Sequence, residues 1–285
     1  MIILFTGAVL ITVVVTYLFL VNPWIDYSRK EEMKPFESVY IAHRGFFIPG
    51  VRPENSLSAF KSAVDHLYGI ELDVQLTEDD RLVVFHDETT DRMCGQHGKV
   101  ANMSYAELQE MRLDGTDETI PLFSEVLDVV KGKVPMIIEV KPEGRCVLAA
   151  KKLMEILAGY AGTYCVESFN PLVLEWLRKN HQDVIRGQLA SNFFRDDGVN
   201  GLLNRFVLTN LLLNFRGRPD FIAYNHRYVN QFTYLLVRKL FNPVNVAWTI
   251  KCQTELEEAR KTFTVFIFDS FVPDSKLALD AIVTR

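Results

Sequence analysis

Three short apolar runs between positions 40 and 87 contain or end in residues that are unusual in apolar runs. They carry His43, Arg44, Glu71, Asp73 and His86. A buried carboxylate is costly unless it is paired with a positive charge or bound to a cation. Strands that carry such residues together therefore predict one shared polar site.

The acidic residues have the spacing of ligands on one face of a strand. Glu71 and Asp73 are two positions apart, as are Glu139 and Lys141 in a later run, and side chains with this spacing leave the same face. Three converging carboxylates repel one another unless a cation joins them. Oxygen ligands suit Ca²⁺ or Mg²⁺ rather than Zn²⁺. We therefore predict that Glu71, Asp73 and Glu139 bind one divalent cation.

Two histidines and two cationic side chains complete the predicted chemistry. His43 and His86 can act as an acid and base pair. Arg44 suits a phosphate group because its guanidinium binds two oxygens at once, and Lys141 suits it as a point charge. Together with a cation that acts as Lewis acid and template, this set indicates cleavage of a phosphodiester. A single Glu or His at a strand end is usually solvated or structural, so it is the accumulation of such residues that favours function.

These side chains need a scaffold that brings the ends of several strands together. Apolar β-rich runs alternate with helical patterns, which is typical of parallel strands joined by helices. The expected strands are 38–43, 69–76, 134–140, 163–169, 184–190, 220–224, 244–250 and 263–268. The expected helices are 56–67, 104–111, 122–130, 145–157, 171–180, 230–240, 254–262 and 275–282, and 192–213 suits one or two short helices.

One further run, 82–85, follows a polar turn that is too short for a crossover helix. It is therefore expected to return antiparallel, as a hairpin that places His86 over the site. Without this arm, eight strands remain, which favours a (β/α)8 TIM-type barrel whose active site lies at the C-terminal strand ends. An open doubly wound sheet is the alternative, but it should have a Gly-rich phosphate loop after its first strand. Phe169 and Trp248 also lie near predicted strand ends, where they could line the pocket or pack in the core.

Residues 2–21 contain no charged side chain. A helix of about 20 residues spans about 30 Å, the thickness of a bilayer's hydrocarbon core. A cleaved signal peptide is the alternative, but no Lys or Arg precedes the run and no small-residue cleavage site follows it. We expect a transmembrane anchor at 1–24, a polar linker at 25–37 and the barrel domain at 38–285. Three basic residues after the anchor place the domain on the cytoplasmic side; they are Arg29, Lys30 and Lys34.

The composition of the 285-residue chain limits the possible partners. Its net charge of −5 argues against a nucleic-acid binder, which would need a basic face. The four cysteines lack the spacing of a metal site; their number permits disulfides, and buried free thiols are the simpler interpretation. No protein partner is inferred.

The ordered series of motifs resembles that of the glycerophosphodiester phosphodiesterases, over roughly residues 39–273. The matching segments are His43-Arg44-Gly45, Pro53-Glu54-Asn55, Glu71-Leu72-Asp73-Val74, Val84-Phe85-His86-Asp87 and Glu139-Val140-Lys141, followed by Glu167-Ser168-Phe169 and Ala247-Trp248-Thr249. That family often has Thr after Pro-Glu-Asn, where Ser56 stands here and keeps the hydroxyl.

The resemblance implies a TIM-type barrel, a divalent cation and hydrolysis of glycerophosphodiesters to an alcohol and glycerol 3-phosphate. It implies that His43 and His86 are the acid and base, and that Glu54 contacts metal or substrate. It also implies that a glycerol hydroxyl attacks phosphorus first, giving a cyclic phosphate that water then opens. Three alternatives remain: cleavage of lysophospholipids by a phospholipase D-like reaction at the same site, a non-catalytic module that binds lipid head groups, and a glycosidase built on the carboxylates.

Overall fold

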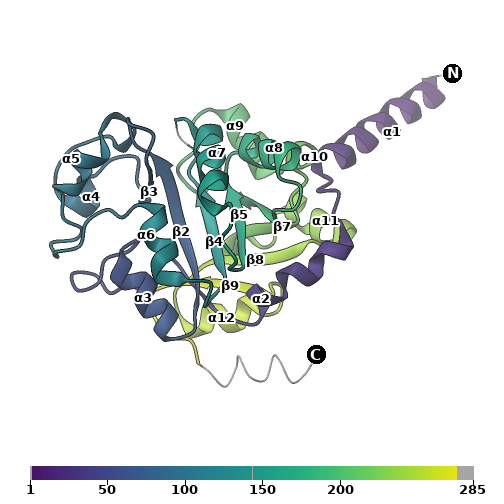
Figure 1. Ribbon diagram of the computed structural model, residues 1–285. Coiled ribbons are helices and arrows are strands. Elements are labelled where there is room, and N and C mark those ends of the chain that lie inside the picture. The colour runs from purple at the N-terminus through teal and green to yellow at the C-terminus, as the bar shows by residue number, and fades with distance from the viewer. Residues whose placement is uncertain (1, 143, 275–285) are drawn as a thin grey trace.

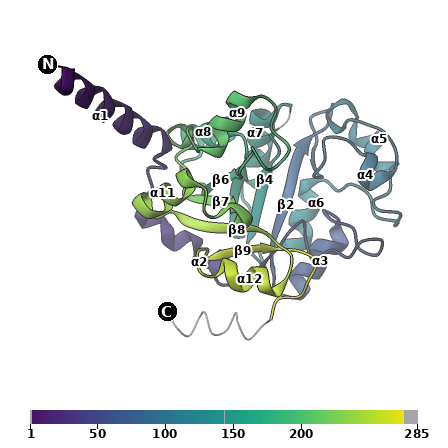
Figure 2. The ribbon, with the colours of Figure 1, turned by 180° about the vertical axis from the view of Figure 1, so that it is seen from behind.

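The computed structural model describes residues 2–142 and 144–274 (Figures 1 and 2). The helix expected at 275–282 lies outside the described residues. The described part of the chain forms a barrel surrounded by helices, with helix α1 (Ile2–Val21) projecting from one side.

Eight parallel strands close into the barrel, because the first strand pairs with both the second and the last. They are β1 (Ile41–Ala42), β2 (Gly69–Leu76), β4 (Met136–Val140), β5 (Tyr164–Ser168), β6 (Arg186–Ala190), β7 (Phe221–Asn225), β8 (Val244–Ile250) and β9 (Val265–Phe268). The predicted TIM-type barrel is therefore confirmed. The expected bounds are exact for β2 and β8, and too wide by one to three residues at the ends of most others.

Strand β3 (Leu82–Val84) forms the predicted hairpin. It pairs antiparallel with β2, with Val74 opposite Val84, and so returns the chain over the end of the barrel. A small lobe follows, at the far left of Figure 1, and contains η2 (Val100–Asn102), α4 (Asp91–Cys94) and α5 (Tyr105–Gln109). This lobe has its own apolar core, formed by Val83, Phe85, Met93, Val100, Leu108, Met111, Leu113 and Ile120.

The helices around the barrel begin where the sequence provides capping residues. Ser56 accepts a hydrogen bond from the Ala59 amide at the start of α3, and Asn170 caps α8, whose first residue is Pro171. The surrounding helices are α3 (Leu57–Asp65), α6 (Phe123–Val130), α7 (Cys146–Leu157), α8 (Pro171–Asn180), α9 (Leu202–Thr209), α10 (Asn214–Gly217), α11 (Phe232–Phe241) and α12 (Gln253–Ala259), with η3 (His226–Tyr228) after β7.

The barrel interior is packed with apolar side chains from every barrel strand except β2. Gly187 leaves space for Phe221, since a Cβ at Gly187 would lie 2.0 Å from the Phe221 ring. The interior cluster contains Ile41, Ile137, Cys165, Ile185, Leu189, Phe221, Ala223, Val244, Val246, Val265 and Ile267. The core therefore fills the barrel below the site, as expected for this fold.

The segment expected to be a polar linker is helical instead. It forms η1 (Tyr27–Met33) and α2 (Lys34–Glu37), and Met33 and Phe36 are each only 1% exposed because they pack against the barrel's interior cluster. Two apolar residues three positions apart, one at the end of η1 and one in α2, thus close one end of the barrel.

The transmembrane anchor predicted at residues 1–24 is not supported. Within residues 2–142 and 144–274, no helix is both long and apolar enough to cross a membrane. The last turn of α1 packs on the barrel domain: Val21 is fully buried, and the hydroxyls of Tyr17 and Thr233 lie 2.6 Å apart. The cytoplasmic placement of the domain, which depended on that anchor, stays a prediction. No disulfide joins Cys94, Cys146, Cys165 and Cys252 within the described residues.

Candidate active site

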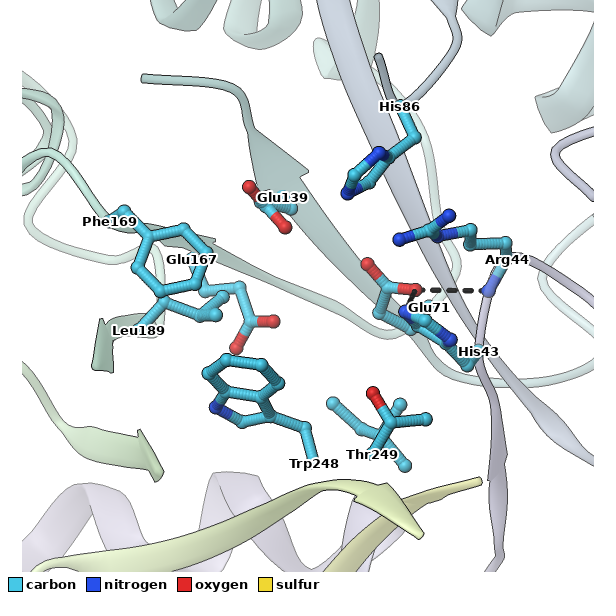
Figure 3. Close-up of a pocket in the computed structure, with 11 residues that line it drawn as sticks. His43, Arg44, Glu71, His86, Glu139, Glu167, Phe169, Leu189, Trp248 and Thr249 are labelled. Carbon is cyan, nitrogen blue, oxygen red and sulfur yellow. Dashed lines mark hydrogen bonds and ion pairs between the residues drawn. The ribbon is translucent and has the colours of Figure 1, made fainter. Parts of the chain in front are cut away.

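A pocket of about 100 Å³ opens at the C-terminal ends of the barrel strands (Figure 3). Figure 3 shows its two sides: His43, Arg44 and Glu71 on one, Glu167 and Phe169 on the other, with Trp248 below. The pocket is lined by His43, Arg44, Glu71, His86, Glu139, Glu167, Phe169, Leu189, Trp248, Thr249 and Ile267.

Three carboxylates converge at this pocket as the sequence predicts. Glu71 and Asp73 leave the same face of β2, and Asp73 is paired in register with Glu139 of β4. One oxygen from each lies within 4.8 Å of the others, and all three residues are at most 5% exposed. Burial, together with the neighbouring carboxylates, raises the pKa of Glu71 and of Glu139.

Lys141 and Arg44 provide positive charge beside these carboxylates. Lys141 Nζ lies 2.9 Å from Glu139 Oε1 and 3.3 Å from Asp73 Oδ1, and Arg44 Nε lies 3.5 Å from Asp73 Oδ2. Burial alone would raise the pKa of Asp73, but Lys141 and other nearby positive charges, with a hydrogen bond from Asn55, hold it well below its ordinary value. Asp73 is thus held ionised.

The chemistry of these residues fits a divalent cation. Counting Glu167, four buried carboxylates share the site with two cations, Arg44 and Lys141, so their formal charges leave an excess of two negative charges. Glu139 Oε1 has no hydrogen-bonding partner in the described structure, although it is close to Lys141. Hard oxygen ligands with this excess charge suit Ca²⁺ or Mg²⁺.

Each of the two histidines is held by a carboxylate. His43 Nδ1 donates to Asp269 Oδ2 over 2.8 Å, and His86 Nδ1 donates to Asp87 Oδ1 over 2.6 Å. A carboxylate can only accept, so both contacts fix the ring with Nε2 directed away from the carboxylate. Burial, and then the charge of Arg44, lower the pKa of His43, while Asp269 opposes them. Both rings line the same pocket.

Arg92 connects the second histidine to the rest of the site. Its Nε lies 2.6 Å from Asp87 Oδ2, and its Nη2 lies 2.6 Å from Glu54 Oε1, which also accepts from Arg44 Nη1 over 2.7 Å. Burial opposes ionisation of Glu54, but hydrogen bonds and charges from the two arginines lower its pKa. Glu54 therefore orients Arg44.

Most of the predicted site residues meet at the pocket. Two of them, Asp73 and Lys141, are buried and do not line the pocket. Glu54 is next to the pocket but does not line it. The predicted residues that line it are His43, Arg44, Glu71, His86, Glu139, Phe169 and Trp248.

Sequence reasoning missed several residues of the site. Glu167 lines the pocket, is 1% exposed, and pairs in register with Glu139. It belongs to a quoted motif at the end of an apolar run, but it had no assigned role. Asp269 follows β9 in the same way, but its pairing with His43 depends on barrel closure. Asn55, which donates a hydrogen bond to Asp73 over 2.8 Å, belongs to a quoted motif but had no assigned role. No pattern in the sequence pointed to Arg92.

Comparisons with known proteins agree with this geometry. The model of the glycerophosphoryl diester phosphodiesterase family matches residues 43–193, just over half of the chain. YhdW of Bacillus subtilis, which is named a putative glycerophosphodiester phosphodiesterase, is 29% identical over 75% of this chain and 86% of its own length. A human lysophospholipase D is 30% identical over 52% of this chain, which spans about half (49%) of that protein.

A solved structure shows the same fold. It is an Oleispira antarctica phosphodiesterase in complex with the product sn-glycerol 3-phosphate, with a TM-score of 0.67 and 21% identity. The match covers 85% of this chain and 96% of the other.

Proposed function

Because this chain belongs to the glycerophosphoryl diester phosphodiesterase family, we propose that it hydrolyses glycerophosphodiesters to an alcohol and sn-glycerol 3-phosphate, using one divalent cation. The observation that carries this proposal is the meeting of three buried carboxylates with His43 and His86 at one pocket. The named activity of a family member that covers most of this chain, YhdW, supports the same reaction.

Glu71, Asp73 and Glu139 would hold the cation, Ca²⁺ or Mg²⁺. When bound, it supplies Lewis acidity toward phosphate oxygens and a template for the substrate. Lys141 holds Glu139 and Asp73 in place through contacts of 2.9 and 3.3 Å, and its charge favours the ionised form of Asp73. Asn55 holds the remaining oxygen of Asp73 from the opposite side. The ligands are therefore preorganised by neighbours whose positions the barrel fixes.

The two histidines would move protons at their Nε2 atoms. One takes the proton from the attacking hydroxyl, and the other gives a proton to the oxygen of the departing alcohol. Asp269 and Asp87, which contact Nδ1 of His43 and of His86, support these two roles. They hold each ring in a single orientation and leave Nε2 to exchange the proton. His43 Nε2 lies 4.0 Å from Glu71 Oε2, so the nitrogen at which His43 would exchange a proton is next to the proposed cation site.

Arg44 and Lys141 would neutralise the phosphate. Arg44 lines the pocket, so its guanidinium can present N–H groups to an anionic oxygen there. Lys141 acts at longer range as a buried charge. The aromatic residues would cover the carbon atoms of the glycerol unit: the rings of Phe169 and Trp248 meet edge to face, with centroids 5.6 Å apart.

A direct test measures release of sn-glycerol 3-phosphate from several glycerophosphodiesters, with chelator and then with added Ca²⁺ or Mg²⁺. The proposal predicts no release with chelator and full recovery with one of the cations. Cation binding without hydrolysis of any diester would instead indicate a non-catalytic module that binds head groups.

Cleavage of lysophospholipids is a second candidate. It is favoured by the apolar side of the pocket, formed by Phe169, Leu189 and Trp248, and by the similarity to a human lysophospholipase D. Comparing glycerophosphocholine with lysophosphatidylcholine as substrates separates the two. Faster turnover of the lysolipid would identify this second activity as the main one.

A further inference from the structure

Glu167 is the buried acidic residue of the pocket that the proposed reaction leaves without a role. It lies on β5, directly in register with Glu139 of β4, and its side chain extends toward the middle of the pocket (Figure 3). It is 1% exposed, and Oε2 has no hydrogen-bonding partner among the described residues. A buried polar atom without a partner is costly, so its retention at a binding pocket suggests that a ligand completes it.

The three carboxylates of the proposed cation site already form a compact group without Glu167. Oxygens of Glu71, Asp73 and Glu139 lie within 4.8 Å of one another, and Glu167 is not part of that group. It is instead on the side of the pocket that carries Phe169 and Leu189, away from His43 and Arg44 (Figure 3). Phe169 and Leu189, its neighbours on that side, are apolar, so a polar group of the substrate can serve as the missing partner.

The glycerol unit of a glycerophosphodiester has two free hydroxyls with different chemical tasks. The hydroxyl on the carbon next to the phosphoester carbon can close a five-membered ring on phosphorus, and it must face a histidine. With that hydroxyl at a histidine, the terminal hydroxyl is two carbons beyond the phosphoester carbon and can reach the opposite side of the pocket, where Glu167 lies. It donates a hydrogen bond, whereas Glu167 offers an oxygen that accepts one.

We propose that Glu167 accepts a hydrogen bond from the terminal hydroxyl of the glycerol unit and thereby selects diesters in which this hydroxyl is free. The inference rests on the proposed function, since it assigns a specificity residue to that reaction. A substrate that lacks the hydroxyl, or carries an acyl chain on it, leaves the buried oxygen unpaired. Sites built around such a hydrogen bond reject analogues that lack it far more strongly than apolar pockets reject a change of size.

The test compares glycerophosphocholine with its deoxy analogue, the phosphocholine diester of propane-1,2-diol, on the full chain. We expect the wild-type protein to prefer glycerophosphocholine by at least about 100-fold in kcat/KM. Glu167→Leu should reduce that preference to within about tenfold, mainly through slower turnover of glycerophosphocholine. Glu167→Gln, whose amide oxygen still accepts, should keep most of the preference. Equal use of both diesters by the wild-type protein would overturn the inference and leave the proposed function intact.

Two further measurements separate the remaining outcomes. Calorimetric titration with Ca²⁺ or Mg²⁺ should give the same cation affinity for the wild-type protein and Glu167→Gln. Glu139→Gln, which changes a proposed cation ligand, should lose binding. Equal loss of binding in both variants would make Glu167 a cation ligand and overturn its role as a hydroxyl acceptor. If the wild-type protein hydrolyses neither these two diesters nor any other glycerophosphodiester, the proposed function fails. The affinities of the protein for sn-glycerol 3-phosphate and for propane-1,2-diol 1-phosphate then test the inference. Tighter binding of sn-glycerol 3-phosphate would support it, and equal affinities would contradict it.

Discussion

Asp269, directly after the last barrel strand, accepts a hydrogen bond from Nδ1 of His43, directly after the first, over 2.8 Å. The two residues are 226 positions apart and meet because β1 and β9 pair in parallel, with Ala42 opposite Phe268. Closure of the barrel thus sets the orientation of a proposed acid or base. Asp269 is a positioning residue, since it does not line the pocket itself.

Asp269→Asn should lower kcat by about 10²-fold or more, with little change in KM. The amide can donate to Nδ1, which favours the wrong tautomer of His43. Loss of the carboxylate also removes a charge that raises the pKa of His43, so the limb of the pH profile that His43 sets should move to lower pH. Ser270→Ala, which removes only a 2.7 Å hydrogen bond to the other carboxylate oxygen, is the matched control. An unchanged profile in Asp269→Asn would show that the contact is merely structural.

Arg92→Met should reduce activity about 10–100-fold, although Arg92 does not line the pocket. Its guanidinium joins Asp87, which holds His86, to Glu54, which holds Arg44. The exposed Arg112, whose guanidinium contacts backbone carbonyls of the same lobe, provides the control variant Arg112→Met. Steady-state kinetics with one glycerophosphodiester is sufficient; similar rates for the two variants would refute the role of Arg92.

The contribution of the site's buried glutamates to the stability of the cation-free protein should fall as pH rises above about 4.5. Burial raises the pKa of Glu71, Glu139 and Glu167 above their ordinary value of 4.5. A group with a raised pKa in the folded state contributes its full stability below its unfolded pKa, and this contribution is lost as pH rises through the folded value. Melting temperatures measured with chelator across this range check the direction.

Cation binding should reverse that loss and release protons, because the ligands must be ionised to bind. Affinity for Ca²⁺ or Mg²⁺ should therefore increase with pH, and the heat of binding should depend on the ionisation enthalpy of the buffer. Calorimetry in two buffers at one pH measures the number of protons released. Buffer-independent heat would mean that these carboxylates are already ionised without the cation.

Phe36→Ala should destabilise the fold by about 3–5 kcal/mol, because the ring is 1% exposed and closes one end of the barrel. For a domain of this size the melting temperature should drop by roughly 10 °C. Phe232, which is 70% exposed, gives the control variant Phe232→Ala, with little expected change. Equal melting temperatures for the two variants would indicate that the segment before the barrel does not contribute to its stability.

Much of the barrel could be predicted because its strands are buried on both faces. Such strands appear as continuous apolar runs, and β2 and β8 were therefore predicted at their exact bounds. The first strand was predicted as six residues but has two, since the chain before Ile41 belongs to the end of α2 and a turn. The buried role of Met33 and Phe36 was missed because two apolar residues among charged ones do not form a detectable period.

Site residues that share one strand could be predicted from the sequence. Residues that come together from different strands were harder to predict. Glu71 and Asp73 are two positions apart, so their common face follows from sequence alone. Glu167 and Asp269 are single residues, and only the register of β4 with β5 and of β1 with β9 brings them to the site. Arg92 lies on a short helix of the lobe after β3, whose packing no periodicity indicates.

The most direct measurement of the central claim is the release of sn-glycerol 3-phosphate by His43→Ala and His86→Ala at saturating cation. Each variant should retain its fold and cation affinity but lose about 10²–10⁴-fold in turnover. His97→Ala, an 83% exposed histidine of the same lobe as His86, should turn over normally. Near-normal turnover in both His43→Ala and His86→Ala would contradict the assignment of these two residues as the acid and base of a glycerophosphodiesterase.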